Sequence, residues 1–235
     1  MTVILLRHGR STANTALTLA GRTSGVALDE TGRTQAQDLC RRLAGLPVEA
    51  VVRSPLMRCR ETVEPLAAAF GVEPVVDEGL VEVDYGSWTG RALSELASEH
   101  MWSVVQQHPS SAVFPEGESL AEMATRAVSA VRAHDRRLAE DAGRDVLWVA
   151  CSHGDVIKSV IADAYGMHLD HFQRIVVEPG SVSVVRYTPH RPFVLRVNDT
   201  GGDLASLRGE PAGHVGRATA GDASSDAVPG GNVPL

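Results

Sequence analysis

The chain has 235 residues, which is enough for one substantial domain or two small ones. Its formal net charge is −7, which argues against nucleic acid as the main partner, because such an interface needs a positively charged surface. Hydrophobic residues make up 43% of the chain and aromatic residues only 4%, so we expect a mostly aliphatic core.

Segments with strand-like and helix-like patterns alternate along the chain. In chain order, hydrophobic periodicity predicts a strand at residues 2–6, a helix at 31–46, a strand at 48–54, a helix at 54–71, an extended segment at 72–83, a helix at 119–139, a strand at 145–154, a helix at 155–166, and two final strands at 180–189 and 193–199. This alternation predicts an α/β fold with a mostly parallel sheet.

Two of the predicted helices begin with recognisable capping signals. Ser54 is expected to cap the helix at residues 54–71, with Pro55 as its first residue. Ser119 and Glu122 form the pattern of a capping box, which predicts that a helix starts there and runs on through residue 139.

The composition changes near residue 201. From there on Gly, Ala, Asp, Ser and Pro dominate, and the hydrophobic periodicity is lost. We therefore expect one domain at residues 1–200 and a disordered tail at residues 201–235.

The sequence indicates an intracellular protein. The opening "MTVILLRHG" has no basic start and too short an apolar run for a signal peptide, and no stretch approaches the length of a transmembrane helix. Cys40, Cys59 and Cys151 show no metal or redox spacing, which suggests reduced thiols. We expect a cytoplasmic location and no membrane partner.

Charged and imidazole side chains follow three of the predicted strands. The first strand ends in Arg7 and His8, and a later strand ends in His153. The second strand leads into a helix that carries Arg58. In an open α/β sheet, ligands gather beyond the carboxyl ends of the strands, and the N-termini of the helices that follow favour an anion. The sequence therefore predicts that these four side chains converge on a phosphate pocket.

Four motifs occur in an order that resembles one known family. They are "LLRHGRST" with Asn14 close behind, "SPLMRCRET", "LVEVDYGSW" and "CSHGD". As a set they are similar to the histidine phosphatase superfamily, the phosphoglycerate-mutase-like proteins, over roughly residues 2–197. The resemblance implies a three-layer α/β/α sandwich, in which the mostly parallel sheet lies between two layers of helices.

The resemblance also implies a role for each residue of the predicted pocket. His8 is the nucleophile that forms a phosphohistidine, which suits a neutral imidazole near neutral pH. Arg7, Arg58 and His153 hold the phosphoryl oxygens, and Asn14 adds a neutral donor. The other ring nitrogen of the nucleophile needs an acceptor, for which a nearby backbone carbonyl would serve. No cofactor or metal is implied, and the remaining histidines lack the spacing of metal ligands.

The proton for the leaving oxygen comes, by the same resemblance, from Glu82. Asp84 and Glu78 are its rivals, because they lie in the same acidic stretch. The role requires a raised pKa, which nearby guanidinium groups oppose. We expect burial against Tyr85 or Trp88 to help, and an acidic-to-neutral pH optimum.

Some positions depart from the family pattern. Arg10 stands where acidic or amide residues are common, and this adds a cation at the mouth of the site. The loop at residues 21–28 is one residue longer than usual, so Gly21 and Arg22 are only weak candidates for substrate contact. Gly154, which follows the second histidine, is a further candidate for substrate binding.

The segment at residues 90–117, which follows the acid motif, is expected to form part of a cap over the site. Glu118 is a lesser candidate for substrate contact, whereas Ser119 is assigned mainly to helix capping. Trp102 either favours an apolar leaving group or belongs to the helix core.

Three functions remain open at this point. The first is a phosphatase, an acid-type phosphomonoester hydrolase that acts on a small phosphorylated metabolite, in a chain that could be a homodimer. The second is a cofactor-dependent phosphoglycerate mutase, but mutases carry a longer insertion than the 71 positions that separate Glu82 from His153 here. The third is a non-catalytic module that binds phosphorylated partners, which the retention of His8 disfavours.

Overall fold

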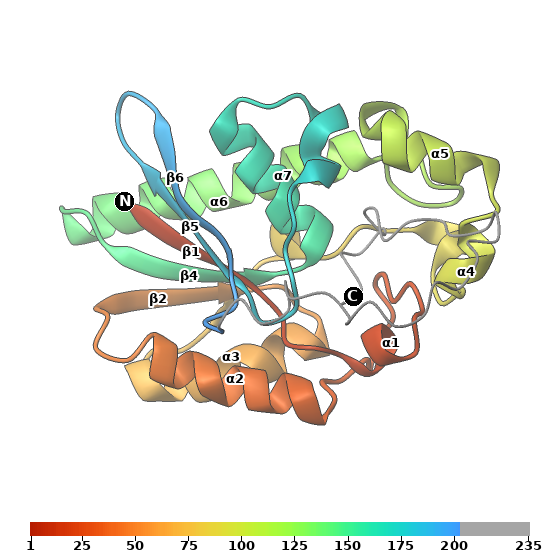
Figure 1. Ribbon diagram of the computed structural model, residues 1–235. Helices are drawn as coiled ribbons and strands as arrows, with labels where there is room; N and C mark the ends of the chain where they lie inside the picture. Colours follow the sequence, from red (N-terminus) through yellow and green to blue (C-terminus); the bar gives the residue numbers. More distant parts are fainter. Residues whose placement is uncertain (203–235) are drawn as a thin grey trace, which may run out of the picture.

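The computed structural model describes residues 1–202, so the predicted tail lies outside the described residues from residue 203 on. The described residues form a six-stranded sheet with helices on both faces (Figure 1). The strands are β1 (Thr2–Arg7), β2 (Val48–Arg53), β3 (Val75–Val76), β4 (Leu147–Ser152), β5 (Val182–Tyr187) and β6 (Pro192–Asp199). The α-helices are α1 (Thr12–Thr15), α2 (Glu30–Arg42), α3 (Met57–Phe70), α4 (Leu93–Leu96), α5 (His100–Gln107), α6 (Leu120–Ala142) and α7 (Gly154–Tyr165). Short 3₁₀ helices are η1 (Glu78–Leu80), η2 (Gly86–Trp88), η3 (Pro109–Ser111) and η4 (Leu169–Arg174).

The sheet is mixed, with the strand order β3-β2-β4-β1-β5-β6. The four strands from β3 to β1 pair in parallel, whereas β5 runs antiparallel to β1 and β6 antiparallel to β5. The predicted α/β fold with a mostly parallel sheet is therefore confirmed. Because parallel neighbours end at the same edge, the residues that follow β1, β2 and β4 come together there.

Two layers of helices sandwich this sheet. Helices α2 and α3 cover one face, and α6 and α7 cover the other (Figure 1). Strand β1 is buried on both sides: Ile4 and Leu6 belong to one apolar cluster, while Val3 and Leu5 belong to the other. This near-continuous apolar run is typical of a strand inside a parallel sheet. None of the helices within residues 1–202 is long and apolar enough to cross a membrane.

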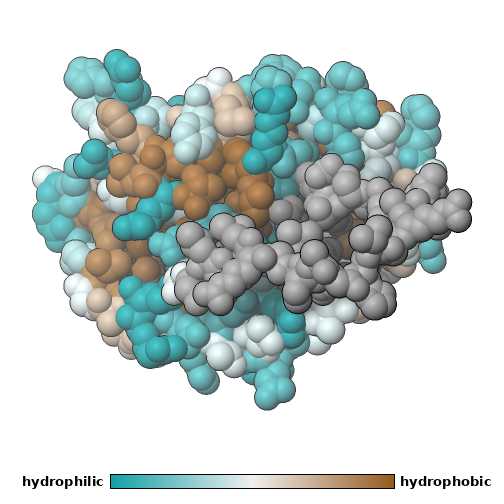
Figure 2. All heavy atoms as spheres, viewed as in Figure 1, coloured by the Kyte–Doolittle hydropathy of each residue, from teal (hydrophilic) through white to brown (hydrophobic). Residues whose placement is uncertain are grey.

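The expected aliphatic core describes only one of the two clusters. The cluster under α2 and α3 has no aromatic side chain among its buried residues. The cluster under α6 and α7 includes the buried aromatic residues Tyr85, Trp88, Phe114, Trp148 and Phe172. At the outer edge of the sheet, β6 leaves apolar side chains exposed, and Figure 2 shows apolar surface over this region.

Several helix boundaries differ from the prediction, and α2 ends at Arg42, four residues before the predicted end at residue 46. Helix α3 begins at Met57, and its N-cap Leu56 makes no side-chain capping bond. The prediction that Ser54 caps this helix is wrong, because the Ser54 hydroxyl lies 2.7 Å from Nε2 of His153 instead. Helix α6 runs three residues further than expected, to Ala142, and ends at Gly143, which has a φ of +63°. Its start is as predicted, with the Ser119 capping box in place.

Candidate active site

The sheet register brings the two sequence-predicted histidines together. Arg7, the last residue of β1, pairs with Ser152, the last residue of β4, so His8 and His153 follow at the same level. The backbone N–H of His8 donates to the Ser152 carbonyl at 3.0 Å. The centroids of the two imidazole rings are 5.2 Å apart.

His8 is held as a neutral ring with its lone pair on Nε2. It is buried, and Nδ1 lies 2.7 Å from the Gly9 carbonyl oxygen. Nε of Arg58 donates to Nε2 of His8 at 3.2 Å, so Nε2 is the acceptor and Nδ1 carries the proton. Burial, reinforced by the charges of Arg58 and Arg7, holds the pKa of His8 well below its usual value. The Gly9 carbonyl is thus the backbone acceptor that the sequence left unidentified.

Two buried guanidinium groups lie beside this ring. Arg7 donates from Nη1 to the Val177 carbonyl at 2.6 Å, and burial lowers its pKa to about 10. Arg58, in the first turn of α3, donates from Nη2 to the Gly21 carbonyl at 2.9 Å. Among the described residues, Nη1 of Arg58 has no hydrogen-bond partner and the side chain forms no ion pair with a carboxylate. A buried cation of this kind is a strong attractor for an anionic ligand.

His153 is fully buried beside Ser54 and Glu82. Its Nε2 lies 2.7 Å from the Ser54 hydroxyl, which also accepts the Leu56 N–H at 3.4 Å. Its Nδ1 lies 4.0 Å from Oε2 of Glu82, beyond hydrogen-bond range, and has no hydrogen-bond partner among the described residues. Burial and the charge of Arg58 keep the pKa of His153 well below its usual value, so the ring is neutral.

Glu82 is the acidic residue that the structure places beside the two histidines. It is buried, and Oε1 accepts the Val83 N–H at 2.9 Å. Burial and the negative charge of Asp155 raise its pKa to about 7, whereas Arg58 opposes the shift. The two other candidates for the proton donor are not buried: the side chain of Asp84 is 41% exposed, and Glu78 lies on the surface.

The remaining candidates for substrate binding lie around this centre. Asn14 accepts the N–H and the hydroxyl of Ser11 at its Oδ1, so it caps the short helix α1. Gly21, with a φ of +49°, holds Arg58 through its carbonyl, and an added Cβ would lie 2.9 Å from a Thr89 oxygen. Gly154 is the buried first residue of α7, directly after His153.

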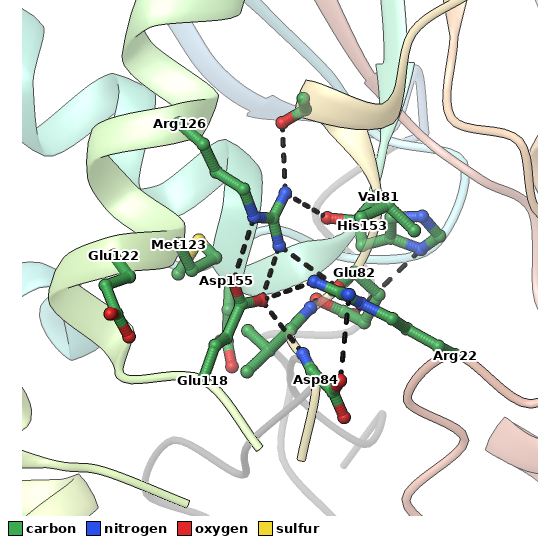
Figure 3. Close-up of polar contacts among 12 residues, drawn as sticks. Arg22, Val81, Glu82, Asp84, Glu118, Glu122, Met123, Arg126, His153 and Asp155 are labelled. Carbon is green, nitrogen blue, oxygen red and sulfur yellow. Dashed lines mark hydrogen bonds and ion pairs between the residues drawn. The ribbon is translucent and has the colours of Figure 1, made fainter. Parts of the chain in front are cut away.

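The cation expected at the site mouth is neutralised. Nε of Arg10 donates to Asp29 at 2.6 Å. Arg22 likewise reaches back into the protein, where it donates to the backbone carbonyl of Glu82 and to the carboxylate of Glu118 (Figure 3). Trp102 stacks on Trp88 with their centroids 6.3 Å apart, which favours the helix-core interpretation of this residue.

Three residues near the centre were missed by sequence reasoning. Ser54 orients His153, Asp155 raises the pKa of Glu82, and Arg126 binds the backbone around Glu82. Asp155 stands inside the "CSHGD" motif and could have been noticed there. Arg126 gives little signal, because the carbonyls that it binds are more than 40 positions away in the sequence.

Taken as chemistry, the arrangement can hold a tetrahedral anion and act on it. It supplies an imidazole lone pair on His8, two guanidinium groups, the neutral ring of His153 and a protonatable carboxyl on Glu82. The N-terminus of α7 lies directly behind His153 and adds a favourable dipole.

The chain is similar in sequence and in fold to known proteins. The family model described as the histidine phosphatase superfamily (branch 1) matches residues 3–200. A probable phosphoglycerate mutase, GpmB of Erwinia tasmaniensis, is 31% identical over 209 residues, which cover 87% of this chain and 94% of that protein. Phosphoserine phosphatase 1 of Hydrogenobacter thermophilus is 26% identical over 203 residues, with 84% and 92% covered. The solved structure of YhfR from Bacillus stearothermophilus matches 84% of this chain and 96% of its own, at 25% identity and a TM-score of 0.76.

Proposed function

This chain belongs to the histidine phosphatase superfamily (branch 1), and from that premise we propose that it is a phosphomonoester hydrolase that forms a phosphohistidine on His8. The state of His8 supports this most directly. The ring is buried and neutral, the Gly9 carbonyl holds the proton on Nδ1, and the lone pair of Nε2 lies beside the Arg58 guanidinium. The substrate class that fits is a small phosphorylated metabolite.

In the first step Nε2 of His8 attacks phosphorus. A phosphoryl oxygen replaces Nε2 as the acceptor of the Arg58 N–H, and Arg7 and His153 share the negative charge. The bond from phosphorus to the leaving oxygen breaks as the new P–N bond forms. Glu82 gives its proton to that oxygen, a step for which a pKa of about 7 is well placed.

The second step restores the enzyme. Glu82, now a carboxylate, takes a proton from a water molecule whose oxygen attacks phosphorus. The P–N bond breaks, its electron pair returns to Nε2 of His8, and inorganic phosphate leaves. General acid–base catalysis of this kind contributes roughly 10²–10⁴-fold to each step.

Phosphoglycerate mutase activity is the second candidate, and the 31% identity to a probable phosphoglycerate mutase favours it. The short connection between Glu82 and His153 speaks for hydrolysis, because a mutase must keep water out while its substrate reorients. Before the long helix α6 and strand β4, this connection holds the short helices η2, α4, α5 and η3.

The test is a screen of phosphorylated metabolites, 3-phosphoglycerate included, with purified protein. We expect inorganic phosphate to accumulate, no isomerised phosphoglycerate, and an acid-labile phosphate on His8 after rapid quenching. His8→Ala should lose both the label and turnover. Isomerised phosphoglycerate without phosphate release would identify a mutase, and full turnover by His8→Ala would refute the phosphohistidine route.

A further inference from the structure

One guanidinium group binds most of the backbone around Glu82. Arg126 projects from α6 toward the segment that carries Glu82, residues 79–84, which we name the Glu82 loop (Figure 3). Its Nη1 donates to the carbonyls of Gly79 at 3.0 Å and Val81 at 2.7 Å, and its Nη2 donates to the carbonyl of Glu82 at 3.1 Å. Three carbonyls of one loop are therefore fixed by a single side chain that the proposed reaction does not use.

Glu118 completes this arrangement. Its carboxylate pairs with Arg126 at 2.6 and 3.0 Å and with Nη2 of Arg22 at 2.9 Å (Figure 3). The same carboxylate accepts the N–H of Asp84 at 2.9 Å, and Arg22 adds a bond to the Glu82 carbonyl at 2.9 Å. The loop is thus bound on both sides of Glu82. The Glu118 side chain is only 15% exposed, and both of its carboxylate oxygens accept hydrogen bonds from within the protein.

The groups that hold the loop are themselves fixed. Glu118 lies directly before Ser119, whose capping box sets the first turn of α6. The N–H of Glu118 donates to the Asp84 carbonyl at 3.0 Å, which joins this segment to the Glu82 loop through the backbone as well. The loop therefore takes its position from the long helix α6.

The charges of this cluster are balanced within it. Arg126 and Arg22 both touch the backbone oxygen of Glu82, but Glu118 pairs with both of them and Asp84 pairs with Arg22 at 3.7 Å, so two carboxylates face the two cations. The cations that lower the pKa of the Glu82 carboxyl are instead Arg58 and Arg7, and the pKa stays raised, at about 7. A loop held by arginines alone would push the pKa of this carboxyl down.

We propose that Arg126 and Glu118 are positioning residues that act through Glu82, by holding its loop where the carboxyl can reach the leaving oxygen. The inference rests on the proposed function. A displacement of a catalytic group by about 1 Å can cost on the order of 10²-fold in rate, so loss of these bonds should be felt wherever Glu82 must donate a proton.

The experiment compares two leaving groups in single-turnover formation of the phosphohistidine. The leaving group of p-nitrophenyl phosphate, p-nitrophenolate, needs no proton. The leaving group of glycerol 1-phosphate is an alkoxide, which must be protonated. We expect Arg126→Gln to lose roughly 10–100-fold with glycerol 1-phosphate and less than about 3-fold with p-nitrophenyl phosphate. Glu82→Gln should show the same selectivity with a larger loss.

A double variant tests whether Arg126 acts through Glu82. In a Glu82→Gln background, Arg126→Gln should add less than about 3-fold, because the group it positions is already gone. The matched control is Arg132→Gln, on the same helix α6, where the side chain is 52% exposed and pairs with Asp163. This control should react as the unmodified protein does with both substrates.

Glu118→Gln keeps the shape of the side chain and carries the test if Arg126→Gln does not fold. It should show the same leaving-group selectivity and move the alkaline limb of the pH profile to lower pH, because the arginine charges lose their counter-ion. Equal losses with both substrates, no loss, or additive losses in the double variant would overturn the inference. If the unmodified protein forms no phosphohistidine with either substrate, the proposed function itself fails.

Discussion

The burial of Glu82 destabilises its ionised form. In a buried site the ionised carboxylate lacks the hydration that it would have in water, and the negative charge of Asp155 destabilises it further, so its pKa rises from 4.5 to about 7. The same shift makes it a proton donor near neutral pH. Residues chosen for chemistry often lower stability in this way, because the environment that tunes them is unfavourable for their charged form.

Replacing Glu82 by Gln should therefore stabilise the protein at alkaline pH. The folded-state pKa lies above the unfolded one, so ionisation costs nothing below about pH 4.5, costs more as the pH rises, and reaches its full cost above about pH 7. At 1.36 kcal/mol per unit the full difference is roughly 3 kcal/mol. Urea unfolding at pH 5 and pH 8 measures it.

The control for this measurement is Glu140→Gln, an exposed carboxyl near the end of α6. This variant should show no such growth of stability with pH. A Glu82→Gln protein that gains equally at pH 5 and pH 8 would show that folding does not raise the pKa of this carboxyl.

The site residues that could be predicted from the sequence are those next to the end of a strand. His8 and His153 follow hydrophobic runs directly, so the rule that parallel strands share an edge was enough to bring them together, and their rings are 5.2 Å apart. The roles of Ser54 and Arg126 could not be predicted, because Ser54 contacts a histidine 99 positions away and Arg126 binds carbonyls more than 40 positions away. Such contacts form only in the packed structure, and no local sequence pattern predicts them.

At the level of elements, the end of the Glu82 loop and the start of η2 meet the segment before α6 with almost no space between their backbones. Gly86 has a φ of +52°, and an added Cβ would lie 2.0 Å from the Pro115 carbonyl oxygen. Gly117, on the opposite segment, would place a Cβ 2.2 Å from the Asp84 carbonyl oxygen. Only glycine allows the N–H of Ser87 to donate to Pro115 at 2.9 Å across this contact.

Alanine at Gly86 should separate the two segments, and Gly90→Ala is its matched control. Both glycines have positive φ, +52° and +84°, so an alanine is strained at either, but nothing lies within 4 Å of a Cβ at Gly90. We expect Gly90→Ala to cost about 1 kcal/mol of unfolding free energy, and Gly86→Ala a further 1–3 kcal/mol or so from the clash. Equal losses in urea unfolding would contradict the close contact.

Element boundaries show the same limit of local reasoning. The capping box at Ser119 was readable because its two partners are three residues apart. Ser54 also precedes a helix in the way that a cap does. Its hydroxyl, however, is hydrogen-bonded to His153, 99 residues away, and α3 begins three residues after Ser54, at Met57. The extended segment expected at residues 72–83 forms only the two residues of β3, because Asp77 then accepts the Gly79 N–H and starts η1.

At the scale of the whole molecule, the site joins parts of the chain from its beginning to its last third. Arg7 and His8 follow β1, Arg58 lies on α3, and His153 precedes α7. An anion bound among them would connect both helix layers to the sheet between them (Figure 1). Its binding energy would therefore add to the stability of the folded chain as a whole, because an unfolded chain cannot assemble the pocket.

Inorganic phosphate, the product of the proposed reaction, should accordingly stabilise the protein against urea. At a concentration of 100 times its dissociation constant, a ligand that binds only the folded state adds about 2.7 kcal/mol. In Arg58→Gln the loss of a charge-assisted hydrogen bond, roughly 1.5–3 kcal/mol, weakens binding about 10- to 100-fold. The same phosphate concentration should then add only about 1.4 to 0.4 kcal/mol. Undiminished stabilisation of Arg58→Gln by phosphate would mean that the anion binds elsewhere on the protein, and Arg132→Gln, which should respond as the unmodified chain does, controls for the loss of one positive charge.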